Sequence, residues 1–415
     1  MWIVGILVFV GVVVFMLNSW GYHQRLEGTS TPETKNLIFM IAMLWYLPKL
    51  IIFPFLLFGQ AGMKLWAKIE EEPKERKHRT ALERKSEIAS DKEITEKDTL
   101  SESESKTITD VSINIEENEK ENKQDRKQDK KYNRRKFVRD VGWSLAGVPF
   151  VITGYGAFKT VHDFQINKVK VRIKNLPKQF EGLRIAQLSD LHLGSFPDYK
   201  PFQEVRRLTN ELKSDIITVT GDFVNFDPME LKPHFESLSE LSADLGVYAC
   251  LGNHDHYMSD KNHKILKGAI EQTGIDLIDN SSRQFELNGS TLNIIGVDNI
   301  GMKQDFGDFD KAIRGIELEN PSILLCHDPR NWDDTVIKNY PDIDLMLAGH
   351  THGGQIAVEL LGLELYPVSM VYKRYVDMYT KGSQHLYVNR GIGTTGPPIR
   401  IGVPPEITEF ELVSV

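Results

Sequence analysis

The chain has 415 residues, of which 41% are hydrophobic and 26% are charged, and its formal net charge at pH 7 is −8. This composition excludes a collagen, a wholly disordered chain and, with only two cysteines, a small scaffold held by disulfides. The net negative charge argues against nucleic acid as the main partner. These averages conceal three segments of very different composition, which follow one another along the chain.

Residues 1–63 are predicted to be a membrane segment with two spans. Residues 1–22 carry no charged side chain, and about 20 apolar residues are enough to cross the hydrocarbon core of a bilayer. A cleaved signal peptide is the alternative, but it normally starts with basic residues, which this run lacks. A second apolar run covers 37–58 and is interrupted only by Lys49. We expect Lys49 to reach toward the headgroups or to lie in a re-entrant hairpin.

Residues 64–140 are predicted to be a charged, disordered linker. Within it, 87–121 hold twelve Asp or Glu against four Lys or Arg. A segment of this composition cannot bury enough apolar surface to offset its chain entropy. Residues 123–139 then hold nine Lys or Arg against two Asp. A basic flank of this kind tends to stay in the cytoplasm.

A moderately apolar, glycine-containing stretch follows at 141–160. Together with Arg134-Arg135-Lys136-Phe137 it resembles a twin-arginine export signal. A third membrane helix with a positive flank is one alternative, and a basic amphipathic foot on anionic lipid is another. All three tether the rest of the chain to a membrane, and the first two place it outside the cytoplasm. We therefore expect a multi-pass protein of the cell membrane whose C-terminal domain faces the extracytoplasmic side.

Residues 165–415 alternate short apolar runs with amphipathic stretches, which is typical of an α/β domain. Asn288-Gly289, between two such runs, predicts a hairpin turn. The strand-rich second half favours a mixed α/β sandwich over a simple doubly wound sheet. Strands are expected at 183–188, 216–220, 246–251, 292–297, 322–326, 345–348 and 386–389, and helices at 199–213, 228–241, 260–273 and 309–315.

Five of these predicted strands run directly into clusters of Asp, His and Asn. The carboxyl ends of strands are where an α/β scaffold gathers the ligands of a bound ion. Asp190 and His192 lie two residues apart in an extended segment, so both point to the same side, and His350 and His352 repeat this spacing. The clusters are Ser189-Asp190-Leu191-His192, Gly221-Asp222, Gly252-Asn253-His254-Asp255, Cys326-His327-Asp328 and Gly349-His350-Thr351-His352-Gly353-Gly354.

The donor types favour a pair of metal ions. Imidazole and carboxylate ligands suit Mn, Fe or Zn, and Cys250 and Cys326 are expected in the core, which argues against a closed zinc site. Four histidines, two aspartates and an asparagine exceed what one ion needs, and would divide into two ions bridged by one carboxylate. Each motif alone is most often structural, so the order of all five within one domain carries the prediction. Glycines at 221, 252, 349, 353 and 354 would let the backbone approach ions or phosphate closely.

The pattern D-x-H, GD, GNHD, H and GHTH over residues 190–352 resembles the calcineurin-like metallophosphoesterase superfamily. Residues 389–407 further resemble its membrane-anchored bacterial branch. The resemblance implies a four-layer α-β-β-α sandwich and a phosphoesterase with two divalent metal ions. Carried over by motif, the ligands would be Asp190, His192 and His352 for the first ion and Asn253, His327 and His350 for the second, with Asp222 bridging both.

The resemblance also implies a mechanism. Two cations would lower the pKa of a bridging water and clamp the phosphoryl oxygens, and the resulting metal-bound hydroxide would attack phosphorus in line with the leaving group. His254 would contact phosphate and protonate the departing oxygen. Asp255 and Asp328 would orient the histidines beside them. Asn225 stands where the family often has an aspartate, which removes one charge next to the ligands.

Other residues are expected to have no role in the chemistry. His234, His263 and His385 are predicted to be structural, because no motif accompanies them. Tyr372 belongs to a group of tyrosines after the GHTHGG loop that would rim a lipid-facing cleft or, as we expect, lie in the core or on the surface. His256, beside the GNHD motif, is a candidate for contact with substrate.

Three functions remain open from the sequence. The first is an exported, membrane-tethered enzyme that hydrolyses a phosphodiester or phosphomonoester near the membrane surface. The second is the same chemistry facing the cytoplasm, as a pyrophosphatase of the UDP-diacylglucosamine type in lipid synthesis. The third is a catalytically inactive metal-binding scaffold. The expected partners are the membrane and a phosphate ester, lipid-linked in the second case, and no nucleic acid.

Overall fold

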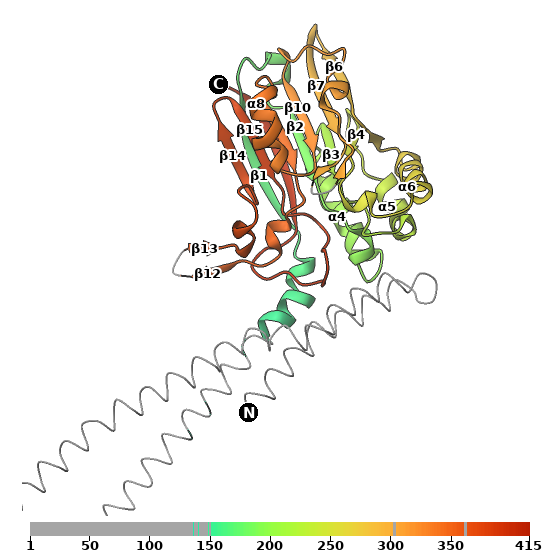
Figure 1. Cartoon of the computed structure of the whole chain (residues 1–415), viewed down its shortest axis with the longest axis vertical. Coiled ribbons are helices and arrows are strands. Elements are labelled where there is room, and N and C mark those ends of the chain that lie inside the picture. The colour runs from blue at the N-terminus through green and yellow to red at the C-terminus, as the bar shows by residue number, and fades with distance from the viewer. Residues whose placement is uncertain (1–135, 137–139, 141–147, 149–150, 302–303, 361–362) are drawn as a thin grey trace, which may run out of the picture. The chain divides into compact units, whose positions relative to one another are not determined.

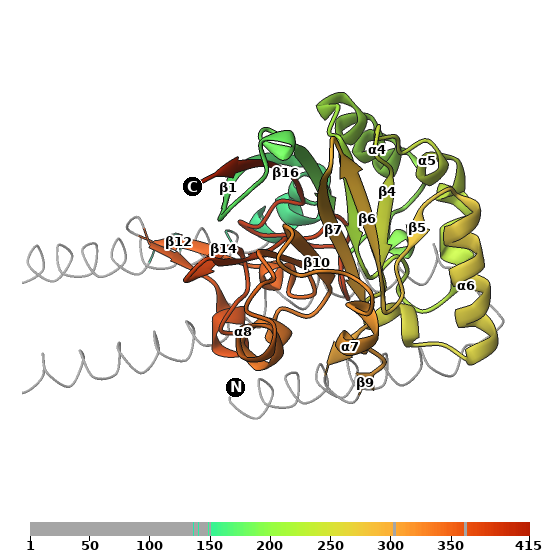
Figure 2. The same ribbon diagram turned by 90° about the horizontal axis from the view of Figure 1, so that it is seen from above.

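The computed structural model describes residues 136, 140, 148, 151–301, 304–360 and 363–415. The spans predicted within 1–63, the linker predicted at 64–140 except for residues 136 and 140, and much of the 141–160 stretch lie outside these residues. No helix among the described residues has the length and apolar character needed to cross a bilayer. From β1 onward, the chain builds two six-stranded sheets that pack face to face (Figures 1 and 2).

The first sheet has the strand order β1-β16-β2-β3-β4-β5. The run from β2 to β5 is parallel, and its central strands are almost entirely buried, as parallel strands between two covering layers require. β16 is antiparallel to β2 and parallel to the edge strand β1. The strands are β1 (Gln165–Ile173), β2 (Arg184–Leu188), β3 (Ile216–Thr220), β4 (Val247–Cys250), β5 (Asp276–Leu277) and β16 (Glu406–Ser414).

The second sheet has the order β14-β15-β11-β10-β7-β6, with antiparallel strands at both edges. Its strands are β6 (Ser281–Leu287), β7 (Ser290–Val297), β10 (Ser322–Cys326), β11 (Leu345–Ala348), β14 (Asp377–Lys381) and β15 (Gln384–Val388). Two small hairpins complete the strands: β8 (Ile300–Gly301) with β9 (Gln304–Asp305), and β12 (Val358–Leu360) with β13 (Leu363–Leu365).

Helices cover the outer face of each sheet (Figure 2). The first sheet carries α4 (Lys200–Leu212), α5 (Phe235–Ser239) and α6 (Asp260–Gln272), and the second carries α7 (Phe309–Ala312), α8 (Ile337–Asn339) and the π-helical turn η7 (Trp332–Val336). Short 3-10 turns connect them: η2 (Thr160–His162), η3 (Lys178–Phe180), η4 (Leu193–Ser195), η5 (Pro228–His234), η6 (His254–His256), η8 (His352–Gly354) and η9 (Pro367–Met370).

Three apolar layers hold the four structural layers together. One lies between the first sheet and α4 to α6, a second lies between the two sheets, and a third lies between the second sheet and its helices. Ile216 and Leu325, for example, are fully buried in the middle layer. The predicted α-β-β-α sandwich is therefore confirmed. Cys250 and Cys326 are buried and unpaired, as predicted.

The expected strands agree with the structure to within about two residues, but two of the helices differ. The helix expected at 228–241 is a 3-10 turn, η5, followed by the short α5, because Pro233 lies inside it and offers no N–H for an α-helical bond. The helix expected at 309–315 ends at Ala312. Asn288 and Gly289 form the predicted two-residue turn between β6 and β7, both with positive φ.

Two strands were not predicted, β1 at the edge of the first sheet and β16 beside it, because charged residues alternate along them. Lys168 and Lys170 of β1 form ion pairs with Glu409 and Glu411 of β16; both lysines are exposed, Glu411 is half-buried and Glu409 is buried. Such a pattern lacks the continuous apolar run that marks the central strands.

Truncation of Leu325 to alanine should destabilise the domain strongly. The side chain is fully buried between the sheets, so its removal leaves a cavity and costs about 2–5 kcal/mol. Leu287→Ala, at an exposed position at the end of β6, is the matched control and should leave the thermal unfolding midpoint nearly unchanged. Equal midpoints for the two variants would contradict the assignment of the middle layer as the core.

Candidate metal centre

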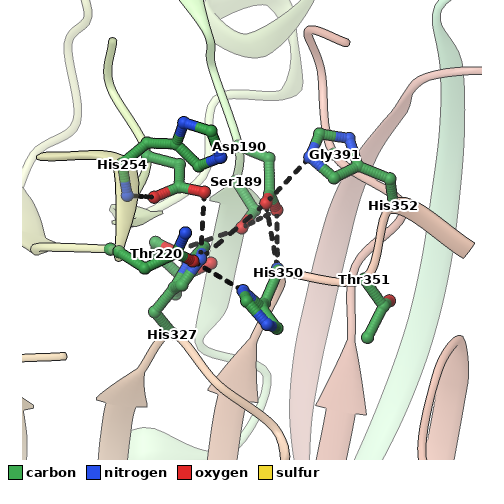
Figure 3. Close-up of polar contacts among 12 residues, drawn as sticks. Ser189, Asp190, Thr220, His254, His327, His350, Thr351, His352 and Gly391 are labelled. Atoms are coloured by element: carbon green, nitrogen blue, oxygen red, sulfur yellow. Dashed lines mark hydrogen bonds and ion pairs between the residues drawn. The ribbon is translucent and has the colours of Figure 1, made fainter. Parts of the chain in front are cut away.

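The predicted ligand side chains converge where strands of both sheets end (Figure 3). Asp190 and His192 follow β2, Asp222 follows β3 and Asn253 follows β4, all in the first sheet. The second sheet contributes the three histidines that follow β10 and β11: His327, His350 and His352. The structure thus joins the five sequence clusters at the contact of the two sheets.

Asp190, His192 and His352 form a first group of donors, all buried and with one ligand atom each within 4.8 Å of the others. The Nε2 atoms of the two histidines face each other at 3.1 Å, and His352 Nε2 lies 3.3 Å from Asp190 Oδ1. Two imidazole nitrogens and a carboxylate oxygen that point at one spot are a suitable donor set for a divalent cation.

Asp222, His327 and His350 form a second group, and the Asn253 side-chain oxygen lies 2.7 Å from His350 Nδ1. His327 Nδ1 is 2.7 Å from the Thr220 carbonyl oxygen, so this nitrogen carries a proton and donates it. His327 Nε2 is buried, has no hydrogen-bond partner among the residues that the structure describes, and lies 3.1 Å from Asp222 Oδ2. A proton or a cation must lie between these two atoms, and a metal ion fits that requirement.

Asp222 lies between the two groups. Its Oδ2 is 3.1 Å from His327 Nε2 and 3.5 Å from His192 Nε2, which belong to different groups. Its Oδ1 accepts the backbone N–H of His254 at 2.8 Å. A carboxylate in this position is placed to contact ions in both groups at once.

The protonation states also suit metal binding. Burial lowers the pKa of His192 to about 3 and that of His350 to about 4, so both rings are neutral at pH 7 and have a lone pair to offer. Burial would raise the pKa of Asp222, but the neighbouring His327 and His254 outweigh it and hold this pKa well below its usual range. Burial likewise opposes the charged form of His327, yet Asp222 raises its pKa to about 10. A metal ion bound between His327 and Asp222 would take the place of this proton.

Five of the predicted ligands adopt the left-handed backbone conformation, with positive φ. Among non-glycine residues such angles are uncommon, cost about 1–3 kcal/mol each and cluster at functional sites. They let the chain turn sharply at the end of each strand, so that the side chain points into the shared site. The residues are Asp190 (φ 50°), His192 (φ 39°), Asp222 (φ 54°), His350 (φ 71°) and His352 (φ 51°).

Two glycines make room for the carboxylates. A Cβ at Gly252 would lie 2.2 Å from Asp222 Oδ1, and a Cβ at Gly349 would lie 2.2 Å from Asp190 Oδ2. The sequence predicted that these glycines approach ions or phosphate. In the structure, the groups that they approach are the carboxylates that would hold the ions.

Asp255, fully buried, joins the loop after β3 to the loop after β4. Its carboxylate accepts the backbone N–H groups of Asp222, Phe223 and Gly252, each at 2.9 Å. It was expected to orient the neighbouring histidine, and in the structure it orients these backbones. Burial, together with the charge of Asp222, raises the pKa of Asp255 to about 7.

Asn225 and Asp328 contact histidines of the site. Asn225 Oδ1 lies 3.0 Å from His192 Nδ1, so the amide takes the place from which an aspartate would fix the same ring. Asp328 Oδ2 lies 3.7 Å from His350 Nε2 and pairs with Arg330. Asn225 thus retains the orienting contact without the negative charge.

His254 is half-buried, whereas the donors Asp190, His192, Asp222 and His352 beside it are buried. Its Nδ1 is 2.9 Å from the Asn225 carbonyl oxygen, and its ring meets that of His192 edge-on with centroids 4.7 Å apart. The half-exposed rings of Phe226 and Tyr257 flank it, at 5.4 Å and 4.8 Å. His254 is thus flanked by two aromatic rings that are open to solvent.

Two residues near the site were missed by sequence reasoning. Arg400 is fully buried, donates to the carbonyl oxygens of Arg390 and Gly391 at 3.0 Å, and lies 3.4 Å from His352 Nδ1. Arg400 lies within residues 389–407, which resemble the membrane-anchored branch of the family, but no motif in the sequence singles it out. The Tyr372 hydroxyl lies 2.9 Å from His350 Nε2, although the sequence placed this tyrosine in the core or on the surface.

Three other histidines have partners of their own. His234 is buried against Phe196 and Phe202, and His385 Nε2 lies 2.9 Å from the Arg172 carbonyl oxygen, which agrees with a structural role. His256 Nε2 lies 2.8 Å from Asp298 Oδ1 rather than facing the site.

Comparison with known proteins agrees with this geometry. Residues 183–354 match the family model for the calcineurin-like phosphoesterases, and residues 1–161 match one described as a probable calcineurin-like phosphoesterase, transmembrane domain. The uncharacterised metallophosphoesterase YkuE of Bacillus subtilis is 33% identical over 68% of this chain and 98% of its own length.

Two further relatives carry named activities. The phosphodiesterase YaeI of Escherichia coli is 28% identical over 68% of this chain and 99% of its own length. The UDP-2,3-diacylglucosamine pyrophosphatase LpxG of Chlamydia trachomatis is 32% identical over 56% of this chain and 85% of its own length. The transmembrane family match indicates that the chain is associated with a membrane. The chain belongs to the calcineurin-like phosphoesterases and is a metal-dependent phosphoester hydrolase.

Proposed function

We propose that this chain is a membrane-tethered hydrolase that uses two divalent ions, Mn, Fe or Zn, to cleave a phosphodiester or phosphomonoester. The observation that carries the proposal is the position of Asp222 between two groups of donors. Asp190, His192 and His352 would hold one ion. Asn253, His327 and His350 would hold the other.

Divalent ions at these positions would supply Lewis-acid polarisation of the phosphoryl oxygens and activation of water. The protein's own contribution is positioning. Asn225 fixes the ring of His192, the Thr220 carbonyl fixes His327, and the Asp255 carboxylate holds the backbone that carries Asp222. Donors that are fixed before substrate arrives need no reorganisation during the reaction.

His254 would protonate the leaving group. The Asn225 carbonyl accepts the Nδ1 proton of its ring, which leaves Nε2 as the atom that can pass a proton. When both nitrogens are protonated, Nε2–H would donate to the departing oxygen of the ester, and the ring would be neutral afterwards. Its half-buried position beside the buried donors supports this role.

A second candidate is a pyrophosphatase that acts on a UDP-linked lipid precursor from the cytoplasmic side. Two observations favour it: the similarity to LpxG, and the Phe226 and Tyr257 rings beside His254, onto which a planar base would stack. An inactive scaffold finds less support, because the full set of donors and His254 is present.

Substitution of His254 by alanine should lower hydrolysis of bis-p-nitrophenyl phosphate by roughly 10²–10⁴-fold, because the leaving oxygen loses its proton donor. The full chain in detergent, loaded with Mn, should keep its metal content as measured by inductively coupled plasma mass spectrometry. His385→Ala, at a histidine bound to the Arg172 carbonyl away from the site, is the control and should stay active. Unchanged turnover in His254→Ala would remove His254 from the mechanism. No turnover in the metal-loaded wild type, on this diester or on p-nitrophenyl phosphate, would favour the scaffold.

Reporter fusions after residue 165 should separate the two orientations. Export predicts alkaline phosphatase activity at this junction, because that enzyme folds only in an oxidising compartment. A fluorescent reporter that matures in the cytoplasm should then be dark at the same junction. The opposite pattern would exclude the extracytoplasmic placement and favour the second candidate.

Phe226→Ala should show whether the substrate carries a nucleobase. If a nucleobase stacks on the Phe226 and Tyr257 rings, the variant should lose roughly 5–150-fold in kcat/KM on a UDP-linked pyrophosphate, the cost of about 1–3 kcal/mol for one base–aromatic contact. Hydrolysis of p-nitrophenyl phosphate, which lacks a nucleobase, should change less. Phe235→Ala, at an exposed position of a helix, is the matched control. Equal losses on both substrates would count against base stacking.

A further inference from the structure

An apolar surface lies beside the metal centre and is not covered by any other described part of the chain. We call it the apolar shelf and define it by Val358 and Leu365 of the β12–β13 hairpin with Met370 and Val371 at the end of η9. Their exposed fractions are 51%, 52%, 90% and 74%. Large apolar side chains exposed together in this way mark an interaction surface.

The hairpin has one apolar and one acidic face. Its register pairs Val358 with Leu365 and Glu359 with Glu364, and neighbouring positions on a strand point to opposite faces. Glu364 accepts a hydrogen bond from the Tyr366 hydroxyl at 2.9 Å, whereas Val358 and Leu365 remain half-exposed. Glu364 thus has a partner within the domain, whereas Val358 and Leu365 form an apolar side of the hairpin that is free to contact another partner.

The base of the hairpin is linked through Arg400 and Ile401 to the helix at 151–158, which lies near the end of the part of the chain that matches the transmembrane family model. The Gly156 carbonyl accepts the N–H of Arg400 at 3.3 Å, and a Cβ at Gly156 would overlap that backbone. The next residue, Ile401, accepts the N–H of Ala357 at 2.8 Å, directly before β12. Figure 1 shows the β12–β13 hairpin and this helix at the same end of the domain.

The helix at 151–158 also exposes large apolar side chains. Ile152, Tyr155 and Phe158 are 45%, 62% and 66% exposed. This helix belongs to the part of the chain, residues 1–161, that matches a transmembrane family model. A bilayer is therefore the partner that the chain itself favours for these exposed apolar side chains.

The apolar shelf is also continuous with the metal centre. Val371 is followed directly by Tyr372, whose hydroxyl lies 2.9 Å from His350 Nε2. The Thr351 hydroxyl, between the two histidines of the GHTH motif, donates to the Tyr375 carbonyl at 2.6 Å. A partner that binds the apolar shelf would therefore lie close to His350 and Thr351.

We propose that the apolar shelf inserts into the interface of the lipid bilayer that anchors the chain, so that the metal centre faces phosphate esters at the level of the headgroups. This inference rests on the membrane tether of the proposed function and adds a second, reversible point of contact. The four apolar side chains enter the acyl boundary, as the apolar face of an interfacial element does.

The first test measures where position 370 lies. The full chain carries only two cysteines, both buried, so Met370→Cys can be labelled selectively with an environment-sensitive fluorophore. In nanodiscs of phosphatidylcholine and phosphatidylglycerol, lipids with a doxyl quencher on the acyl chain should quench this label strongly. Leu287→Cys on β6, which Figure 1 places at the other end of the domain, is the control and should be quenched little.

Equal, weak quenching at both positions would overturn the proposal. A blue-shifted emission at position 370 that depends on protein concentration and not on the lipid quencher would assign the surface to a second copy instead. Because quenching needs no turnover, an inactive enzyme leaves this result readable, and failure of the proposed function is seen separately.

The second test measures the consequence for catalysis. The double variant Met370→Asp with Val371→Asp should lose roughly tenfold or more in hydrolysis of a phosphodiester headgroup in the same nanodiscs, because charged side chains resist entry into the acyl boundary. Its turnover of soluble bis-p-nitrophenyl phosphate should match the wild type, and Leu287→Asp should match the wild type on both. Equal losses on soluble and bilayer substrates, or no loss on either, would contradict the proposal.

Discussion

The site depends on one buried carboxylate, that of Asp222, which contacts histidines of both donor groups. A buried charge is costly unless it is paired, and the local structure around Asp222 meets this demand. Asp255 holds the backbone N–H of Asp222, Gly252 leaves space for its Oδ1, and His327 faces its Oδ2. The left-handed conformations at the strand ends bring the other donors to the same place. Their strain is offset by the surrounding sheets, which fix each strand end.

The sequence was sufficient to predict the central strands and the residues that come together at their ends. Parallel buried strands are recognisable from continuous apolar runs, and their carboxyl ends meet at one edge. It did not reveal β1 and β16, because Lys168 and Glu409 interrupt the apolar pattern while pairing across strands far apart in the chain. The sequence did not predict a role for Arg400 either, because its hydrogen bonds to the Arg390 and Gly391 carbonyls form only when the tail folds against the site.

The contacts of Arg400 also connect the helix that contains Gly156 with the donor groups. Its backbone meets Gly156, near the end of the segment that matches a transmembrane domain, and its guanidinium lies against the loop that packs on Asp190 and His352. The same segment continues through Ile401 to the base of the β12–β13 hairpin. The helix at 151–158, the base of the β12–β13 hairpin and the loop beside the donor groups are thus joined through one short stretch of chain.

The central claim is that two divalent ions occupy this site with Asp222 between them. Anomalous X-ray scattering from crystals of the Mn-loaded protein, recorded at the Mn absorption edge, tests it most directly. The account predicts two peaks, one enclosed by Asp190, His192 and His352 and the other by Asn253, His327 and His350, with Asp222 in contact with both. A single peak, or peaks away from Asp222 under saturating Mn, would contradict it.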